Sequence, residues 1–197
     1  SRYVERRLLD RFVQIEVVLG LVGGCSALML YGAFAWLPYY LPVLYAVSIV
    51  VGALIGMEIP LVIRLLQDEL SLEVNVAAVL GLDYLGALAA SIAFPLLLLP
   101  YLGQMATAFL AGLLNVFVAL LCCLLLRAHL ERPRRLLAGT AGATIVLAAG
   151  LVFSGTLVSK TEGSLYEDTV IFSETTPHQR LVLTRWLYPP QVEDVSP

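Results

Sequence analysis

The sequence predicts an all-α transmembrane helix bundle of about five spans, followed by a short β-hairpin that begins a truncated second domain. Hydrophobic residues make up 59% of the 197 residues and charged ones only 14%, too few for a soluble domain of this length to cover its surface. The apolar residues gather in stretches that each reach the ~20 residues a helix needs to cross a bilayer. These stretches are Phe12–Trp36, Tyr40–Leu66, Asn75–Pro100, Gln104–Leu126 and Leu136–Val158.

Short links join the first four stretches, so these are predicted to lie as antiparallel neighbours. The links are Leu37–Tyr39, Gln67–Val74 and Tyr101–Gly103. The fifth stretch is diluted by glycine, threonine and serine. It therefore has two interpretations, a full crossing or a re-entrant or interfacial segment.

Basic residues cluster at two places along the chain, at residues 1–11 and 127–135, although the net charge is −3. Four predicted spans separate the clusters, which puts both on one side of the membrane, and the positive-inside rule makes that side the cytoplasm. A full crossing by the fifth stretch would then place the tail outside. The charge pattern does not contain the features typical of a nucleic-acid-binding protein.

After Lys160 the sequence changes to β-rich runs at 166–172 and 179–185, which flank a turn cluster containing Pro177. This pattern predicts a β-hairpin. We therefore divide the chain into a multi-pass bundle at 1–158 and the start of a second domain at 159–197. About forty residues are too few for a core, and the chain opens on Ser1 without an initiating methionine, so we expect a fragment that lacks one or two upstream spans.

Three carboxylates lie inside the apolar stretches, where each costs roughly 2.5–3.5 kcal/mol at a helix centre. The first, Glu16, shares a helix face with Gly20 and Gly24, and such a small-residue face should pack against another helix. The alternative is that Glu16 lies near the cytoplasmic interface and pairs with Arg11 or with lipid headgroups.

The other two acids are Glu58 and Asp83. Glu58 lies beside Pro60, whose missing N–H loosens the helix next to the acid; its alternative role is a structural acid bonded to a neighbouring helix or to Arg64. Asp83 shares a stripe of small residues with Gly86, so its partner is expected on a helix that approaches this stripe. The three acids together predict a polar interior that binds a cation or a proton.

Further small-residue patterns are typical of helix packing. Asn115 lies on a stripe that contains Ala108, Gly112 and Ala119, and Gly52 and Gly56 form another close pair.

The cysteines and histidines predict no metal site and no catalytic residue. The cysteines Cys25, Cys122 and Cys123 all lie inside apolar stretches, and their spacing fits neither a disulfide framework nor a metal framework. His129 and His178 stand alone outside the stretches, without ligand partners at a useful spacing.

Several runs of the sequence resemble one family. Residues 173–185, SETTPHQRLVLTR, are similar to the amino-terminal β-hairpin of spermidine synthases, the polyamine aminopropyltransferases. Residues 1–12 with Glu16, the run GMEIPL at 56–61 and the run LDYLGA at 82–87 look like the membrane-embedded bacterial branch of that family. In this branch a multi-pass domain precedes the synthase domain.

The resemblance implies aminopropyl transfer from decarboxylated S-adenosylmethionine, as co-substrate and with no other cofactor, to putrescine, in a parent protein of the bacterial inner membrane. Gln179 matches the family glutamine that contacts the donor, and an amide can donate and accept without adding charge near a sulfonium. The family's second donor-site glutamine, Gly-rich nucleotide loop and catalytic aspartate have no counterpart after Arg185. The fragment itself is therefore expected to be inactive.

Two other functions stay open on the residues alone. The bundle is alternatively a transporter-like module for a cation or a polyamine, lined by Glu16, Glu58 and Asp83, or a plain membrane anchor. In each case the lipid bilayer is a partner, and a second copy of the chain is a candidate partner.

Overall fold

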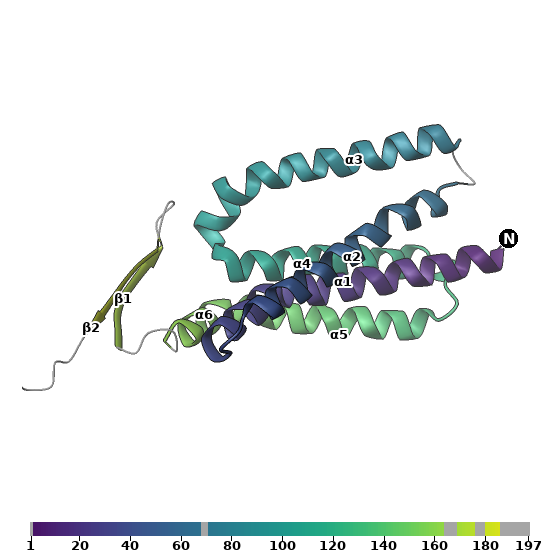
Figure 1. Ribbon diagram of the computed structural model, residues 1–197. Helices are drawn as coiled ribbons and strands as arrows, with labels where there is room; N and C mark the ends of the chain where they lie inside the picture. Colours follow the sequence, from purple (N-terminus) through teal and green to yellow (C-terminus); the bar gives the residue numbers. More distant parts are fainter. Residues whose placement is uncertain (1, 68–70, 164–168, 176–179, 186–197) are drawn as a thin grey trace, which may run out of the picture.

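The computed structural model describes residues 2–67, 71–163, 169–175 and 180–185. Helices dominate these residues, and a two-stranded antiparallel sheet follows them (Figure 1). The elements in chain order are α1 (Arg2–Trp36), α2 (Leu41–Leu65), α3 (Leu72–Ala93), the π-helical turn η1 (Phe94–Leu98), α4 (Leu99–Leu125), the 3-10 turn η2 (Arg127–His129), α5 (Pro133–Val152), α6 (Ser154–Gly163), β1 (Thr169–Thr175) and β2 (Arg180–Arg185).

The first two helices follow the first two apolar stretches closely. α1 ends at Trp36 as predicted, but it begins already at Arg2 because the arginine-rich segment continues the same helix. α2 begins at Leu41, with Pro42 in its first turn, where a residue without an N–H group costs no helical hydrogen bond.

Among the described residues, four helices are long and apolar enough to cross a membrane, against five predicted spans, because the third and fourth predicted spans belong to one helical stretch. Residues 72–125 form one helical stretch of 54 residues, which is kinked at Gly103, inside the predicted link Tyr101–Gly103. The chain accommodates Pro95 and Pro100 in and beside the wider turn η1 instead of ending the helix there. Only Gly103 leaves helical geometry, at φ 76° and ψ 174°, a region open to glycine. In Figure 1, α4 folds back from α3 around this region.

The predicted fifth stretch is divided into two helices. α5 starts at Pro133 and is long and apolar enough to span a membrane. It ends at Val152, and α6 begins at Ser154, so the predicted end of the stretch at Val158 lies within α6.

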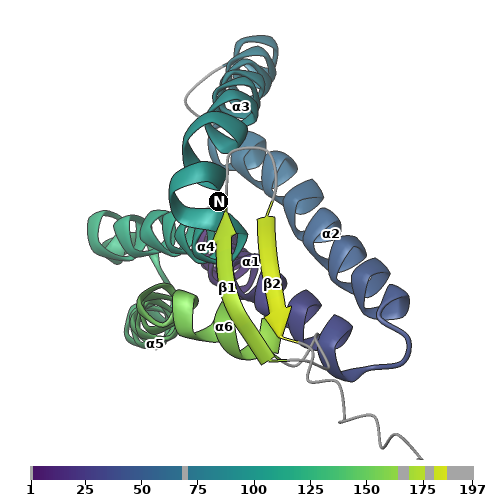
Figure 2. The ribbon, with the colours of Figure 1, turned by 90° about the vertical axis from the view of Figure 1, so that its left-hand side faces the viewer.

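The core of the bundle lies between α1, α4 and α5. Its buried side chains form two clusters. One consists of Leu9, Val13, Ala119, Cys123, Leu130 and Leu136, and the other of Met105, Phe109, Val116, Ala143 and Leu147. α2 crosses α1 obliquely and α3 lies at the outer edge of the bundle (Figures 1 and 2). Most of the apolar surface of α2 and α3 is consequently exposed, which suits a lipid environment better than water.

The closest approach between helices lies where α1 meets α4. A β-carbon placed at Gly112 would lie 2.7 Å from Cα of Gly24, and one placed at Gly20 would lie 2.7 Å from the carbonyl oxygen of Gly112. The small-residue face of α1 therefore packs as predicted, and its neighbour is the small-residue stripe of α4. The other predicted pair, Gly52 and Gly56, has no packed neighbour within 4 Å.

The predicted hairpin is present as β1 and β2. Thr175 lies opposite Arg180, and the register shifts between Val170 and Phe172. β1 continues through part of the predicted turn, to Thr175. Gln179, the predicted donor-contacting residue, lies outside the described residues.

Replacing Gly112 by alanine should destabilise the bundle by about 1–3 kcal/mol, because the added methyl group meets backbone atoms of α1. Gly52→Ala is the matched control, since its β-carbon meets nothing within 4 Å and alanine favours a helix by up to about 1 kcal/mol. Thermal unfolding in detergent micelles compares the two variants. Equal melting temperatures would rule out the close approach of α1 and α4.

Candidate functional site

Two of the three predicted intramembrane acids meet between α1 and α2. The side chains of Glu16 and Glu58 lie near enough to each other to interact electrostatically. Glu16 is only 2% exposed, and Glu58 is partly buried. Among the residues that the structure describes, the partner of Glu16 is thus a second acid and not Arg11.

Glu16 lies one helical turn after the start of its apolar stretch at Phe12, and Glu58 lies six residues before Arg64. At ~1.5 Å per residue, Glu16 is about 13 Å along α1 from Arg7, and Glu58 is about 10 Å before the end of α2 at Leu65. Glu58 also precedes Pro60, which lies inside α2 and leaves one backbone carbonyl without its helical donor. The acids therefore meet beside a weakened stretch of helix, away from the helix ends.

A hydrogen bond between two carboxyl groups needs a proton, because an ionised carboxylate can only accept. Two like unit charges repel each other by roughly 4 kcal/mol at a separation of about 4 Å, even at an effective dielectric constant of about 20. This arrangement can hold one proton between the two acids or a cation in its place.

Asp83 does not join this pair. It is exposed on α3, together with every residue from 81 to 90, and a β-carbon at Gly86 would meet nothing within 4 Å. The helix that was predicted to approach this stripe is therefore not found among the described residues. The reason is that α3 packs mainly at its ends, against α2 and η1.

Asn75 is a buried polar residue to which the sequence interpretation gave no role. Its side-chain amide donates to the carbonyl of Ile63 at 2.7 Å, in the last turn of α2, where carbonyls lack helical donors. Its Oδ1 has no partner among the described residues. The sequence signal for this contact was an asparagine, Asn75, placed a few residues after the predicted end of the second stretch at Leu66.

At the start of α1, a polar cluster joins this helix to the loop between α4 and α5. The carboxylate of Asp10 is 6% exposed and accepts a hydrogen bond from the backbone N–H of Glu131 at 3.0 Å. Nε of Arg7 lies 3.7 Å from Oε1 of Glu131. These contacts place both basic segments at one end of the bundle, as the alternation of spans predicted.

The opposite end of α1 has its own polar contact. The hydroxyl of Tyr31 donates to Oε1 of Gln104 at 2.9 Å, close to the bend at Gly103. Within the described parts of the chain, no three His, Cys, Asp or Glu side chains gather where they could hold a metal ion.

Known proteins named polyamine aminopropyltransferase are similar to this chain over most of its length. The one from Leptospira interrogans is 40% identical over 186 residues, which cover 94% of this chain and 37% of that protein. Polyamine aminopropyltransferase 2 of Ralstonia nicotianae is 44% identical over 196 residues, which cover 94% of this chain and 38% of the relative. The one from Mycobacterium tuberculosis is 35% identical over 185 residues, covering 88% and 35%.

The chain thus spans little more than a third of the length of the curated relatives that it matches. No family model matches it, and no solved structure does.

Glu16→Gln should leave the unfolding free energy within about 1 kcal/mol of the parent chain, because an amide can still donate to Glu58. Glu16→Leu should lower it by about 1–3 kcal/mol, since Glu58 then loses its partner. Asp83→Leu is the control, an acid removed from an exposed helix face, and should be neutral or stabilising. Unfolding in lipid nanodiscs tests all three; Glu16→Gln and Glu16→Leu behaving alike would show that no hydrogen bond joins the acids.

Proposed function

We propose that this chain, which is homologous over most of its length to proteins named polyamine aminopropyltransferase, is the membrane-spanning part of a bacterial aminopropyltransferase. The observation that carries the proposal is 40–44% identity over 94% of the chain. An alignment of that extent includes the apolar helices as well as the hairpin. The relatives therefore share the apolar segments, which are not an addition peculiar to this chain.

In this proposal residues 1–158 are a multi-pass bundle in the inner membrane and residues 159–197 begin the synthase domain. Four helices of sufficient length and apolar character support the first part, and the hairpin of β1 and β2 supports the second. The lipid bilayer is then a permanent partner of the chain.

The proposed reaction is the attack of a neutral putrescine amine on the aminopropyl carbon of decarboxylated S-adenosylmethionine. A carbon–nitrogen bond forms, the carbon–sulfur bond breaks, methylthioadenosine leaves with the bonding electron pair, and the amine loses a proton to give spermidine. Gln179 would contact the donor through its amide. The nucleotide loop and the catalytic aspartate that the resemblance implies do not occur in these 197 residues, so we expect the reaction only in the full-length protein.

In the full-length protein, Gln179→Ala should raise the KM for the donor by about 2–10-fold while changing kcat less, because one neutral hydrogen bond to the bound donor is lost. Gln67→Ala removes the same group between α2 and α3 and is the control. Steady-state kinetics with putrescine measure both variants. A donor KM unchanged by Gln179→Ala would show that this residue does not contact the donor. Spermidine formation by the 197-residue chain alone would contradict the expectation that the reaction needs the full-length protein.

A second candidate function, binding or transport of a cation or a polyamine by the bundle, is favoured by the Glu16–Glu58 pair. The chain in proteoliposomes would take up labelled spermidine, Glu16→Gln would lose most of that uptake, and Asp83→Asn would keep it. Uptake no faster than in empty liposomes would exclude transport and favour a plain anchor.

A further inference from the structure

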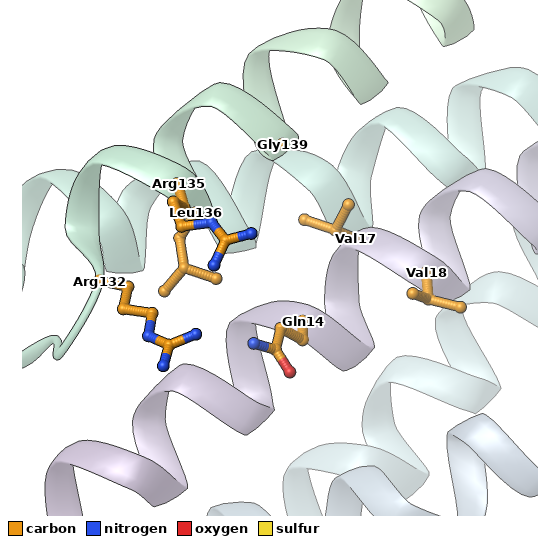
Figure 3. A pocket seen from close by; sticks show the side chains of 7 residues that line it. All are labelled: Gln14, Val17, Val18, Arg132, Arg135, Leu136 and Gly139. Carbon is orange, nitrogen blue, oxygen red and sulfur yellow. The ribbon is translucent and has the colours of Figure 1, made fainter.

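A groove runs between α1 and the start of α5, at the basic end of the bundle. It encloses about 440 Å³ and is lined by Gln14, Val17, Val18, Arg132, Arg135, Leu136 and Gly139 (Figure 3). Both helices start at this end, because the Asp10 and Arg7 contacts hold the start of α1 against the loop before α5. The groove therefore opens where the two helices would enter a membrane.

The polarity of the lining changes along the groove. Its polar groups are the amide of Gln14 and the guanidinium groups of Arg132 and Arg135, which lie toward the starts of the two helices (Figure 3). The rest of the lining is apolar. On α1 it consists of Val17 and Val18, which come one helical turn after Gln14, and on α5 it consists of Leu136 and Gly139, which come after Arg135. A ligand that fills the groove thus needs a polar end at the membrane surface and an apolar end deeper in.

Both charged residues in the lining of the groove are positive, although Arg132 and Gln14 also line a neighbouring pocket that contains Asp10 and Glu131. No acid lines it, and among the described residues neither Arg132 nor Arg135 has an ion-pair partner. The nearest acids along the chain are already engaged, since Glu131 lies 3.7 Å from Arg7 and Asp10 accepts the Glu131 N–H. The N-terminus of the 20-residue helix α5 adds a partial positive charge at the same place.

Guanidinium groups at a membrane surface recognise phosphate through planar, bidentate hydrogen bonds. The groove is also accessible from the side of the bundle, because Gln14, Val18, Arg132 and Arg135 are exposed. We propose that this groove binds an anionic glycerophospholipid, with its phosphate between Arg132, Arg135 and Gln14 and the first part of an acyl chain against Val17 and Leu136. This inference is independent of the proposed enzymatic function.

Native mass spectrometry of the 197-residue chain in detergent tests the proposal, with phosphatidylglycerol as the probe and phosphatidylcholine as the neutral reference. The double variant Arg132→Gln/Arg135→Gln should weaken phosphatidylglycerol binding by about tenfold or more and leave phosphatidylcholine binding unchanged. The matched control is Arg127→Gln/Arg134→Gln, which removes the same charge from the same basic segment outside the groove lining. It should change binding by less than about threefold.

Gly139→Leu tests the apolar half of the groove without changing its charge. A β-carbon at Gly139 meets nothing within 4 Å, so the variant should fold and yet occupy the space of the acyl chain. It should weaken phosphatidylglycerol binding but leave the binding of inorganic phosphate, measured in parallel, unchanged. The proposal is overturned if phosphatidylcholine binds as well as phosphatidylglycerol, if the two double variants behave alike, or if inorganic phosphate alone displaces the lipid at equal concentration.

Discussion

The close contact of α1 with α4 is the interaction on which the rest of the bundle depends. In the proposed membrane location there is little hydrophobic drive to bring two apolar helices together, so they would gain their stability from close packing and from polar contacts. Gly20, Gly24 and Gly112 let the two backbones approach within van der Waals distance, and both buried clusters line the faces that α1 and α4 share with α5. α2 and α3 then add to this three-helix unit from outside.

Because α1 is central, the polar contacts that fix the other elements also start from it. Its first turns bind the loop before α5 through Asp10 and Arg7, and its far end binds the start of α4 through Tyr31. Between these points Glu16 meets Glu58 of α2. One helix thus brings together the basic groove and the acid pair, which are the two places in the described chain where ligand chemistry is concentrated.

The sequence predicted what depends on local pattern and missed what depends on tertiary contact. Runs of apolar residues located α1 and α2, and the face of Gly20 was recognised from spacing alone. The predicted link at Tyr101–Gly103 contains the bend at Gly103, where the backbone leaves helical geometry, whereas the π-helical turn at Phe94–Leu98 was not predicted. Asp83 was expected to meet a helix, and its exposure follows from where α3 packs, which no residue of α3 reveals.

In the proposed topology these helices cross a membrane, with the basic loop at one face and the hairpin at the other. Single cysteines at Ala128 and at Ser164, in a background without the three native cysteines Cys25, Cys122 and Cys123, test it with a membrane-impermeant reagent. Ala128 is exposed in the basic loop, and Ser164 directly follows α6. In this topology one position is labelled in intact cells and the other only after lysis. Labelling of both positions under the same condition would contradict the crossing.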